Sequence, residues 1–229
     1  MAKAIYDFGL IGLGTMGKNL LMNISDHGYE VAGYDKDLSK VQSLKDETGD
    51  IYGAETVEDF VASLEKPRKI MMLVPAGKVV DYVIADLMPL LDRGDIIMDG
   101  GNSFFKDTER RQKELKGTGI HYLGIGISGG AEGARRGPSM MPGGNKTAYN
   151  KVRPILESVA AKIGKQACVT YLGEGSVGNY VKMVHNGIEY GLMQILAEVY
   201  DVMQQGLGCQ MLKSTKHLQI GMKRSCVLF

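Results

Sequence analysis

Hydrophobic and polar positions over most of the chain switch between two periods. Short apolar runs of strand length cover Ala4–Ile11, Tyr29–Tyr34, Lys69–Val74, Asp95–Met98, Ile120–Gly124 and Val169–Tyr171. Segments with helical periodicity lie between them, at Met16–His27, Leu38–Thr48, Thr56–Leu64, Lys78–Leu91, Phe105–Lys116 and Lys146–Ala161. Strands that alternate with helices in this way form parallel sheets with helices on both faces. The pattern therefore predicts an α/β fold with a doubly wound, mostly parallel sheet.

A glycine turn joins the first predicted strand to the first predicted helix. It reads Gly12-Leu13-Gly14-Thr15-Met16-Gly17, and Asp35 follows the second predicted strand. In such a unit the first glycine permits a tight turn, the second lets a pyrophosphate approach the backbone, and the third lets helix and strand pack closely. The acidic residue accepts hydrogen bonds from a ribose. These features predict a Rossmann-type domain that binds a dinucleotide.

Other turns follow predicted strands at the edge where such folds bind ligands. The turn after Lys69–Val74 is Pro75-Ala76-Gly77, and the next reads Asp99-Gly100-Gly101-Asn102-Ser103. Asn102 is either a ligand-binding amide or the centre of a local Asx turn.

The stretch from Gly124 to Gly144 is rich in glycine, and we expect it to form neither a helix nor a regular strand. A flexible linker is one interpretation. We favour a substrate loop, because Ser128, Gly129 and Gly130 follow a predicted strand and would offer a hydroxyl and bare N–H groups to a carboxylate.

A long helix is predicted from Asn179 to about Gln205, after a last glycine turn at Gly173–Gly178. One face of it carries side chains that suit acid–base chemistry, at i, i+3, i+4, i+7 and i+8: Lys182, His185, Asn186, Glu189 and Tyr190. Lys182 and Glu189 would lie about 10 Å apart along the axis. A small substrate between them would meet a base at one end and an acid at the other. The alternative is a solvated helix face with ordinary charges.

Composition excludes several classes of protein. The 229 residues are 44% apolar and 23% charged, with a net charge of +1, which is typical of a globular protein and not of a nucleic-acid-binding surface. Cys168, Cys209 and Cys226 lack metal-ligand spacing, and the histidines form no H-x-x-x-H pair, so no metal site is predicted. No apolar run approaches the roughly 18 residues of a membrane span, and the N-terminus has no signal-peptide pattern. We expect a cytoplasmic protein with reduced thiols and without nucleic-acid or membrane partners.

Together these motifs resemble those of the 6-phosphogluconate dehydrogenases, decarboxylating members of the β-hydroxyacid dehydrogenase superfamily. The resemblance rests on G-L-G-T-M-G-K-N-L, M-L-V-P-A-G, D-G-G-N-S, G-I-S-G-G-A-E-G-A-R-R-G-P-S-M-M-P-G-G and K-M-V-H-N-G-I-E-Y-G, in the family's order between Ile5 and Gly208. The last motif is the most specific. The resemblance implies oxidative decarboxylation of 6-phosphogluconate to ribulose 5-phosphate and CO2 with reduction of NAD(P), a step of the pentose phosphate pathway. It also implies a homodimer for the full-length family.

The resemblance also implies roles for individual residues. Lys182 would be the general base for the C3 hydroxyl, which requires a neutral amine, and Glu189 the acid that protonates C1 after loss of CO2. The sugar acid would be held by Asn102, Ser128, Gly129, Gly130, His185 and Asn186, with Tyr190 at its phosphate. The dinucleotide would be held by Gly12, Leu13, Gly14, Thr15, Met16, Gly17, Asp35, Lys36, Asp37, Val74, Pro75, Ala76 and Asn102. No metal is required, because the β-ketone of the intermediate is already an electron sink.

The residues after the second strand leave the choice of cofactor open. Family members that use NADP commonly read N-R-T there, whereas this chain reads Asp35-Lys36-Asp37. Asp35 suits the 2′-hydroxyl of NAD and repels the 2′-phosphate of NADP, while Lys36 would attract that phosphate as a point charge. The charges favour NAD and the resemblance favours NADP. Pro75, Ala131 and Arg136 also differ from the commonest family residues.

The expected organisation has three parts. Residues 1–178 would form the dinucleotide-binding domain, and residues 179–208 the first long helix of an all-helical second domain that is otherwise missing. Residues 209–229 form a tail with four Lys/Arg and no Asp/Glu, and we find no family resemblance in it. Gln219–Leu228 can be back-translated so that a neighbouring frame encodes a W-N-x-x-x-L-x-S run of the family. We therefore expect a frameshift, which the DNA sequence of the gene would test.

Such an end has consequences for activity. The apolar stripe from Val181 to Val199 would be exposed, and we expect a chain that binds the cofactor with weak or no turnover. Two other interpretations stay open. One is a β-hydroxyacid dehydrogenase for a small acid without phosphate, and the other is a non-catalytic nucleotide-binding module.

Overall fold

The structure is a computed structural model that describes residues 6–48 and 51–206. The chain divides into two units, Met1–Met183 and Val184–Phe229. The expected boundary after residue 178 lies five residues before this division, and the expected tail, residues 209–229, lies outside the described residues.

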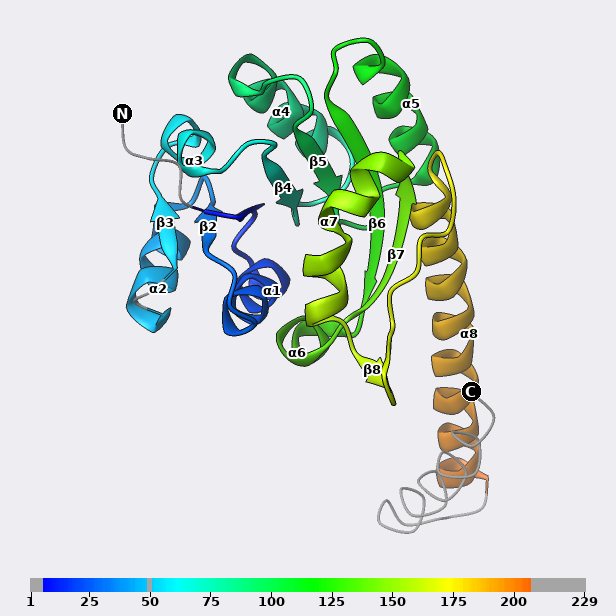
Figure 1. Ribbon diagram of the computed structural model, residues 1–229. Coiled ribbons are helices and arrows are strands. Elements are labelled where there is room, and N and C mark those ends of the chain that lie inside the picture. Colours follow the sequence, from blue (N-terminus) through cyan, green and yellow to red (C-terminus); the bar gives the residue numbers. More distant parts are fainter. Residues whose placement is uncertain (1–5, 49–50, 207–229) are drawn as a thin grey trace. The chain divides into compact units, whose positions relative to one another are not determined.

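A seven-stranded sheet forms the centre of the first unit (Figure 1). Its strands are β1 (Phe8–Ile11), β2 (Val31–Tyr34), β3 (Tyr52–Ala54), β4 (Lys69–Met72), β5 (Ile96–Asp99), β6 (His121–Ser128) and β7 (Ser139–Gly144). The order is β3-β2-β1-β4-β5-β6-β7, and only the β6–β7 pair is antiparallel. Strands are added outwards from β1 to β3 on one side and from β4 to β6 on the other, so the strand order reverses between β1 and β4. The predicted doubly wound, mostly parallel sheet is confirmed.

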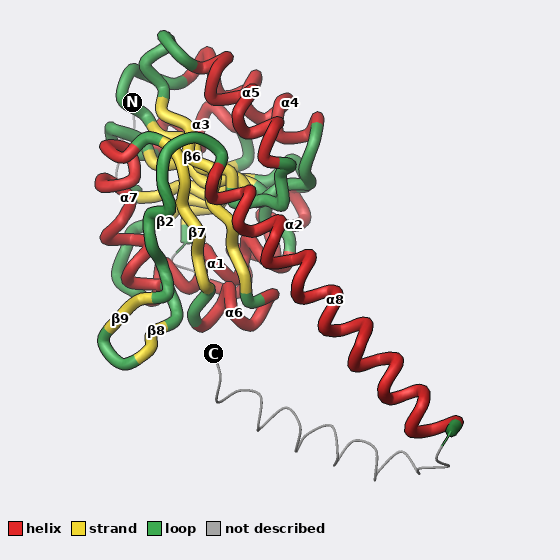
Figure 2. Tube along the Cα trace, turned by 90° about the vertical axis from the view of Figure 1, so that its right-hand side faces the viewer, coloured by secondary structure: helices red, strands yellow, loops and turns green. Residues whose placement is uncertain are grey.

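Helices cover both faces of this sheet, as the red coils on either side of the yellow strands show in Figure 2. One face carries α1 (Thr15–Asp26), α2 (Leu38–Thr48), α6 (Gly130–Arg136) and α7 (Lys146–Val159). The other carries α3 (Val57–Ser63), α4 (Lys78–Leu87) and α5 (Phe105–Leu115). A 3-10 turn, Met88–Leu90, follows α4, and a small hairpin pairs β8 (Lys162–Ile163) with β9 (Gln166–Ala167). The core is two apolar layers, one on each side of the sheet.

Side-chain caps begin two of these helices where the sequence favours them. Thr56 Oγ1 accepts a hydrogen bond from the Asp59 N–H at 3.1 Å and caps the start of α3. Asn145 Oδ1 accepts one from the Ala148 N–H at 2.9 Å at the start of α7.

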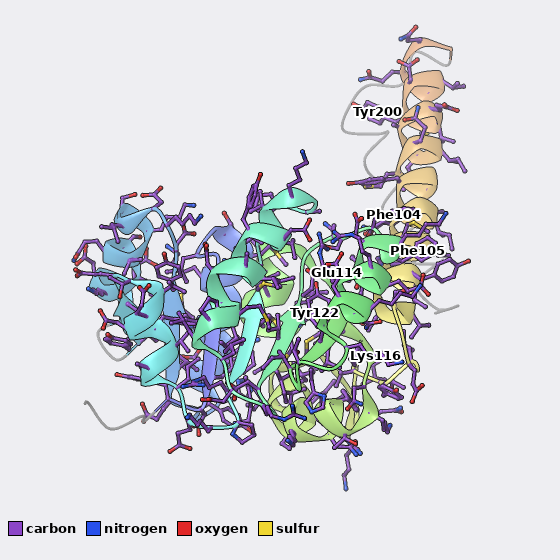
Figure 3. All side chains as sticks on the ribbon, turned by 90° about the horizontal axis from the view of Figure 1, so that it is seen from above. Phe104, Phe105, Glu114, Lys116, Tyr122 and Tyr200 are labelled. Atoms are coloured by element: carbon purple, nitrogen blue, oxygen red, sulfur yellow. The ribbon has the colours of Figure 1, made fainter. Side chains whose placement is uncertain are left out.

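The long helix α8 (Val177–Gln205) begins two residues before the predicted position. Its first turns pack on β6 at positions where only glycine fits. A Cβ at Gly124 would lie 2.0 Å from Asn179 Oδ1, and one at Gly126 would lie 2.5 Å from Lys182 Cβ. The ring of Phe105, at the start of α5 (Figure 3), meets that of Tyr180 edge-on at 5.2 Å.

Two expectations about secondary structure were wrong. The glycine-rich stretch from Gly124 to Gly144 is not irregular, because it forms the end of β6, then α6, then β7. The reason is that some of these glycines are needed for close packing and not for flexibility. Gly124 and Gly126 have regular strand backbone, and their missing side chains leave room for α8. The predicted strand Val169–Tyr171 makes only an isolated bridge, from Val169 to Met140.

In the second unit the structure describes residues 184–206, nearly all in α8. Val184, Ile188, Leu192, Ile195 and Val199 are exposed along it. Among the described residues, no helix combines the length and the apolar character needed to cross a bilayer.

Candidate functional site

The glycine turn has the geometry of a phosphate-binding turn. Gly12 has φ +99°, and a Cβ there would lie 2.4 Å from Leu73 O. A Cβ at Gly17 would lie 1.8 Å from Gly12 O, so α1 can approach the strand only through glycine. At Gly14 nothing lies within 4 Å of a Cβ, and no side chain caps α1 there. The open glycine thus stands at a helix N-terminus, where backbone N–H groups attract a phosphate.

Asp35 is held at the mouth of this turn. Its Oδ2 accepts a hydrogen bond from the Leu13 N–H at 2.8 Å, and Lys40 Nζ lies 3.3 Å from the same oxygen. Its Oδ1 accepts one from the Asp37 N–H at 2.9 Å, and the side chain is only 12% exposed. The carboxylate is therefore fixed beside the glycine turn, where a ribose would lie.

A cavity of about 500 Å³ lies between these groups and the turn after β4. Apolar side chains form much of its wall, and Asp35, Lys36, Lys40 and Asp86 provide its charges. Its lining residues are Ile11, Gly12, Gly14, Tyr34, Asp35, Lys36, Lys40, Val57, Leu73, Val74, Pro75, Val79, Tyr82, Val83 and Asp86. An adenosine group fits this combination of an apolar wall and a ribose-binding carboxylate. The residues present therefore fit a dinucleotide.

Other predicted cofactor residues lie outside this cavity. Leu13 and Thr15 line a second hollow, which shares Gly14 and Lys40 with the first. Met16 packs against the core, and Ala76 is exposed. Asp37 begins α2, where its Oδ1 accepts hydrogen bonds from the N–H and hydroxyl of Ser39, and these bonds lower the pKa of the Asp37 carboxyl.

The residues predicted to hold a sugar acid in the first unit come from three elements. Asn102 is exposed in the loop after β5, Ser128 ends β6, and Gly129 and Gly130 begin α6. Lys182 is only 7% exposed and packs against Gly126 of β6. Just before Asn102, Asp99 Oδ1 accepts a hydrogen bond from the Gly101 N–H at 3.1 Å.

The second unit carries the remaining predicted residues on α8. His185 Nδ1 lies 3.6 Å from Glu189 Oε2 and 3.3 Å from Asn186 Oδ1. Tyr190 is 69% exposed. Within the described part of the chain, no group of His, Cys, Asp and Glu side chains could hold a metal ion.

Sequence reasoning missed a buried polar cluster beneath the loop after β5. Asp99, Arg111 and Tyr122 are all buried, and the Tyr122 hydroxyl donates to Asp99 Oδ2 at 2.9 Å. Burial raises the pKa of the Asp99 carboxyl. Burial is also the main cause that raises the pKa of the Tyr122 hydroxyl, and the nearby charge of Asp99 adds to it. These residues lie far apart in sequence, so no motif joins them. The one available signal was Arg111, a charged residue on the buried face of an amphipathic helix.

Comparison with known families identifies this arrangement. Residues 7–173 match the family model of the NAD binding domain of 6-phosphogluconate dehydrogenase. The chain belongs to the 6-phosphogluconate dehydrogenase family. Residues 178–219 match the model of the C-terminal domain of 6-phosphogluconate dehydrogenase, and the match ends eleven residues beyond Gly208. The expectation that the tail from residue 209 has no family resemblance is therefore wrong for residues 209–219.

Relatives within the 6-phosphogluconate dehydrogenase family are identical to this chain at about half of the aligned positions. The decarboxylating 6-phosphogluconate dehydrogenase of Synechococcus elongatus is 51% identical over 208 residues, 90% of this chain and 44% of that protein. The NADP(+)-dependent, decarboxylating enzyme of Bacillus subtilis is 50% identical over 202 residues, 87% of this chain and 43% of that protein.

A solved structure agrees with these relatives. The 6-phosphogluconate dehydrogenase of Plasmodium falciparum, solved in its apo form and in complex with NADP+ and with 6-phosphogluconate, superposes with a TM-score of 0.84 at 46% identity. The match covers 89% of this chain and 44% of that one. The chain therefore spans less than half the length of the relatives that it matches.

Proposed function

We propose that the chain binds a nicotinamide adenine dinucleotide at the carboxyl edge of its sheet and serves the oxidative decarboxylation of 6-phosphogluconate to ribulose 5-phosphate and CO2. The observation that carries the proposal is the open Gly14 at the N-terminus of α1, beside a cavity of about 500 Å³ closed by the fixed Asp35 carboxylate. Family membership and the names of the relatives supply the substrate.

The reacting groups in this proposal are Lys182 and Glu189. Lys182 accepts the proton of the C3 hydroxyl, and a bound dinucleotide would supply the acceptor for the hydride of C3. The resulting β-keto acid loses CO2, and the ammonium of Lys182 stabilises the developing enolate oxygen. Glu189 then donates a proton to the carbon that carried the carboxylate, which becomes C1 of ribulose 5-phosphate. The supports are the burial of Lys182 against β6 and the family membership of the chain.

The remaining predicted residues hold the substrate in this proposal. Asn102, Ser128, Gly129 and Gly130 follow β5 and β6, whose carboxyl ends lie at the same edge of the sheet as the glycine turn. The family resemblance adds His185 and Asn186 to the substrate-binding residues and assigns Tyr190 to the phosphate. We also propose a cytoplasmic location and, as for the full-length family, a homodimer, which light scattering would test.

The charges around Asp35 favour NAD over NADP. Lys40 is already paired with Asp35, and Lys36 Nζ lies 3.6 Å from Asp86 Oδ2, so both nearby cations have carboxylate partners. The B. subtilis relative is named NADP(+)-dependent, and the P. falciparum structure includes NADP+. This chain would therefore differ in cofactor preference from those relatives.

Calorimetric titration of the 229-residue chain with NAD, NADP and 6-phosphogluconate tests the proposal. We expect saturable dinucleotide binding, and 6-phosphogluconate binding that gluconate without the phosphate does not reproduce. Lys182→Met should abolish any formation of reduced cofactor and leave dinucleotide binding intact. A chain that binds no dinucleotide refutes the proposal. Oxidation of a small hydroxy acid and not of 6-phosphogluconate would favour another β-hydroxyacid dehydrogenase. Dinucleotide binding with neither binding nor oxidation of 6-phosphogluconate would favour a nucleotide-binding module.

A further inference from the structure

A buried arginine, Arg111, joins two loops at the carboxyl edge of the sheet. Its side chain is 1% exposed. Nη2 donates to Gly77 O at 2.9 Å, at the end of the loop after β4. Nη1 donates to Ser103 Oγ at 3.3 Å, at the end of the loop after β5. A single guanidinium on α5 therefore contacts both loops.

Acidic groups hold that guanidinium in place. Its Nε donates to Asp81 Oδ1 at 2.7 Å, and its Nη1 lies 3.6 Å from Asp99 Oδ2. Asp99 in turn accepts hydrogen bonds from the Tyr122 hydroxyl and the Gly101 N–H. The position of Arg111 is thus fixed from α4 on one side and from β5 and β6 on the other.

The two loops also touch each other directly. A Cβ at Gly101 would lie 3.0 Å from Val74 O, so the two backbones are in contact. Asn179 Nδ2 donates to Gly101 O at 3.4 Å from the start of α8, and Thr108 of α5 donates to Asn179 Oδ1 at 3.0 Å. A displacement of one loop would therefore move the other.

Stability alone does not account for a buried arginine at this point. Burial of a charged pair costs desolvation energy, and apolar side chains of similar volume often replace such pairs without loss of stability. A planar guanidinium, however, fixes several hydrogen-bond directions at once, which an apolar side chain or a lysine cannot do. The arrangement is suited to setting the distance between the two loops.

A dinucleotide lies across the point where the strand order reverses. Its adenosine half would lie near Asp35, on the β1–β2 side. Its nicotinamide half would then extend along this edge towards Gly77 and Asn102, in the later parts of the loops after β4 and β5. Val74, where the first of these loops begins, also lines the adenosine cavity. These are the loops that Arg111 contacts.

We propose that Arg111 is a positioning residue that holds the Val74–Gly77 and Asp99–Ser103 loops at the spacing required by the nicotinamide half of the dinucleotide. It acts through the backbone of these loops. The inference rests on the proposed dinucleotide function and adds a residue to it.

Dissociation constants for NAD and for ADP, which lacks the nicotinamide half, test the role of Arg111. Arg111→Lys should weaken NAD binding by about tenfold or more, because small displacements of positioning groups are costly, and should change ADP binding less than about twofold. Arg110→Lys is the matched control. Arg110 also contacts Asp81, at 2.9 Å, but its side chain is 43% exposed, so neither constant should change.

Equal weakening of NAD and ADP by Arg111→Lys would indicate a general structural role and overturn the proposal. Indistinguishable constants in the two lysine variants would overturn it too. If Arg111→Lys does not fold, Ser103→Ala removes one contact of the same network. It should also weaken NAD and spare ADP, and equal effects on both would overturn the proposal. A wild-type chain that binds no NAD would refute the proposed function itself, before any substitution is compared.

Discussion

The substitution Asp35→Asn tests the electrostatic basis of cofactor choice. It removes the charge of a carboxylate that is 12% exposed and bonded to the Leu13 N–H, while it keeps the shape and one acceptor oxygen. We expect the wild type to bind NAD more tightly than NADP. The substitution should narrow or reverse that preference, because a 2′-phosphate beside Asp35 brings like charges together in a partly enclosed cavity.

The magnitude follows from the separation and the screening. A carboxylate and a phosphate about 5 Å apart repel by about 3 kcal/mol per unit charge at an effective dielectric of about 20, and by about 0.8 kcal/mol in bulk water. Lys40, 3.3 Å from Asp35, offsets part of this repulsion. A net change of about 1.4 to 3 kcal/mol corresponds to a shift of roughly tenfold to a hundredfold in the ratio of the two dissociation constants.

The assay is calorimetric titration with NAD and NADP at one fixed ionic strength, since salt screens such interactions. Asp37→Asn is the control. It removes the same charge two positions away, at a carboxylate that bonds Ser39 at the start of α2, and should leave the ratio nearly unchanged. Tighter wild-type binding of NADP than of NAD would contradict the reasoning. So would an equal shift of the ratio in both variants.

Three further predictions concern stability. Gly126→Ala should lower the free energy of unfolding by about 1–3 kcal/mol, because its Cβ would lie 2.5 Å from Lys182 Cβ. Gly187→Ala is the control, because a Cβ there meets open space and should not lower that free energy. Urea unfolding measures both variants, and equal effects would contradict the packing argument. Thr56→Ala should lower the stability by about 1 kcal/mol, because the hydrogen bond from the Asp59 N–H that caps α3 is lost. Thr56→Ser keeps a hydroxyl acceptor and should retain the wild-type stability in thermal unfolding. Equal stability of wild type and Thr56→Ala would show that this cap contributes nothing. Hydrogen bonds from Arg111 and then Arg110 lower the pKa of the Asp81 carboxyl in the folded protein. The ionised carboxyl therefore contributes its full stabilisation above the pKa of the unfolded chain, about 4, and this stabilisation is lost as the pH falls through the folded pKa. Unfolding measured from about pH 6 to pH 2 should thus show a steeper acid loss in the wild type than in Asp81→Asn, and identical slopes would exclude this linkage.

Patterns close together in the sequence predicted their own structure well. The glycine turn with its helix and the alternation of strands and helices depend on neighbouring residues, and both are present. The position of Asp35 beside Gly14 was also predictable, because the distance along a strand–helix–strand unit is set by the unit itself. The sequence did not predict that Asp37, Met16 and Ala76 lie outside the cavity beside Asp35, because the direction of each side chain decides this.

What the sequence determined by itself is the parallel sheet, the dinucleotide-binding turn and the long helix α8. Only the tertiary structure decided that the glycine-rich stretch after Gly124 is strand and helix, because its glycines are required by the close approach of Asn179 and Lys182. The tertiary structure also brought Arg111 to Gly77, Ser103 and Asp99. Such a cluster leaves no periodic signal in the chain, since its members meet only after separate helices and strands pack around one sheet.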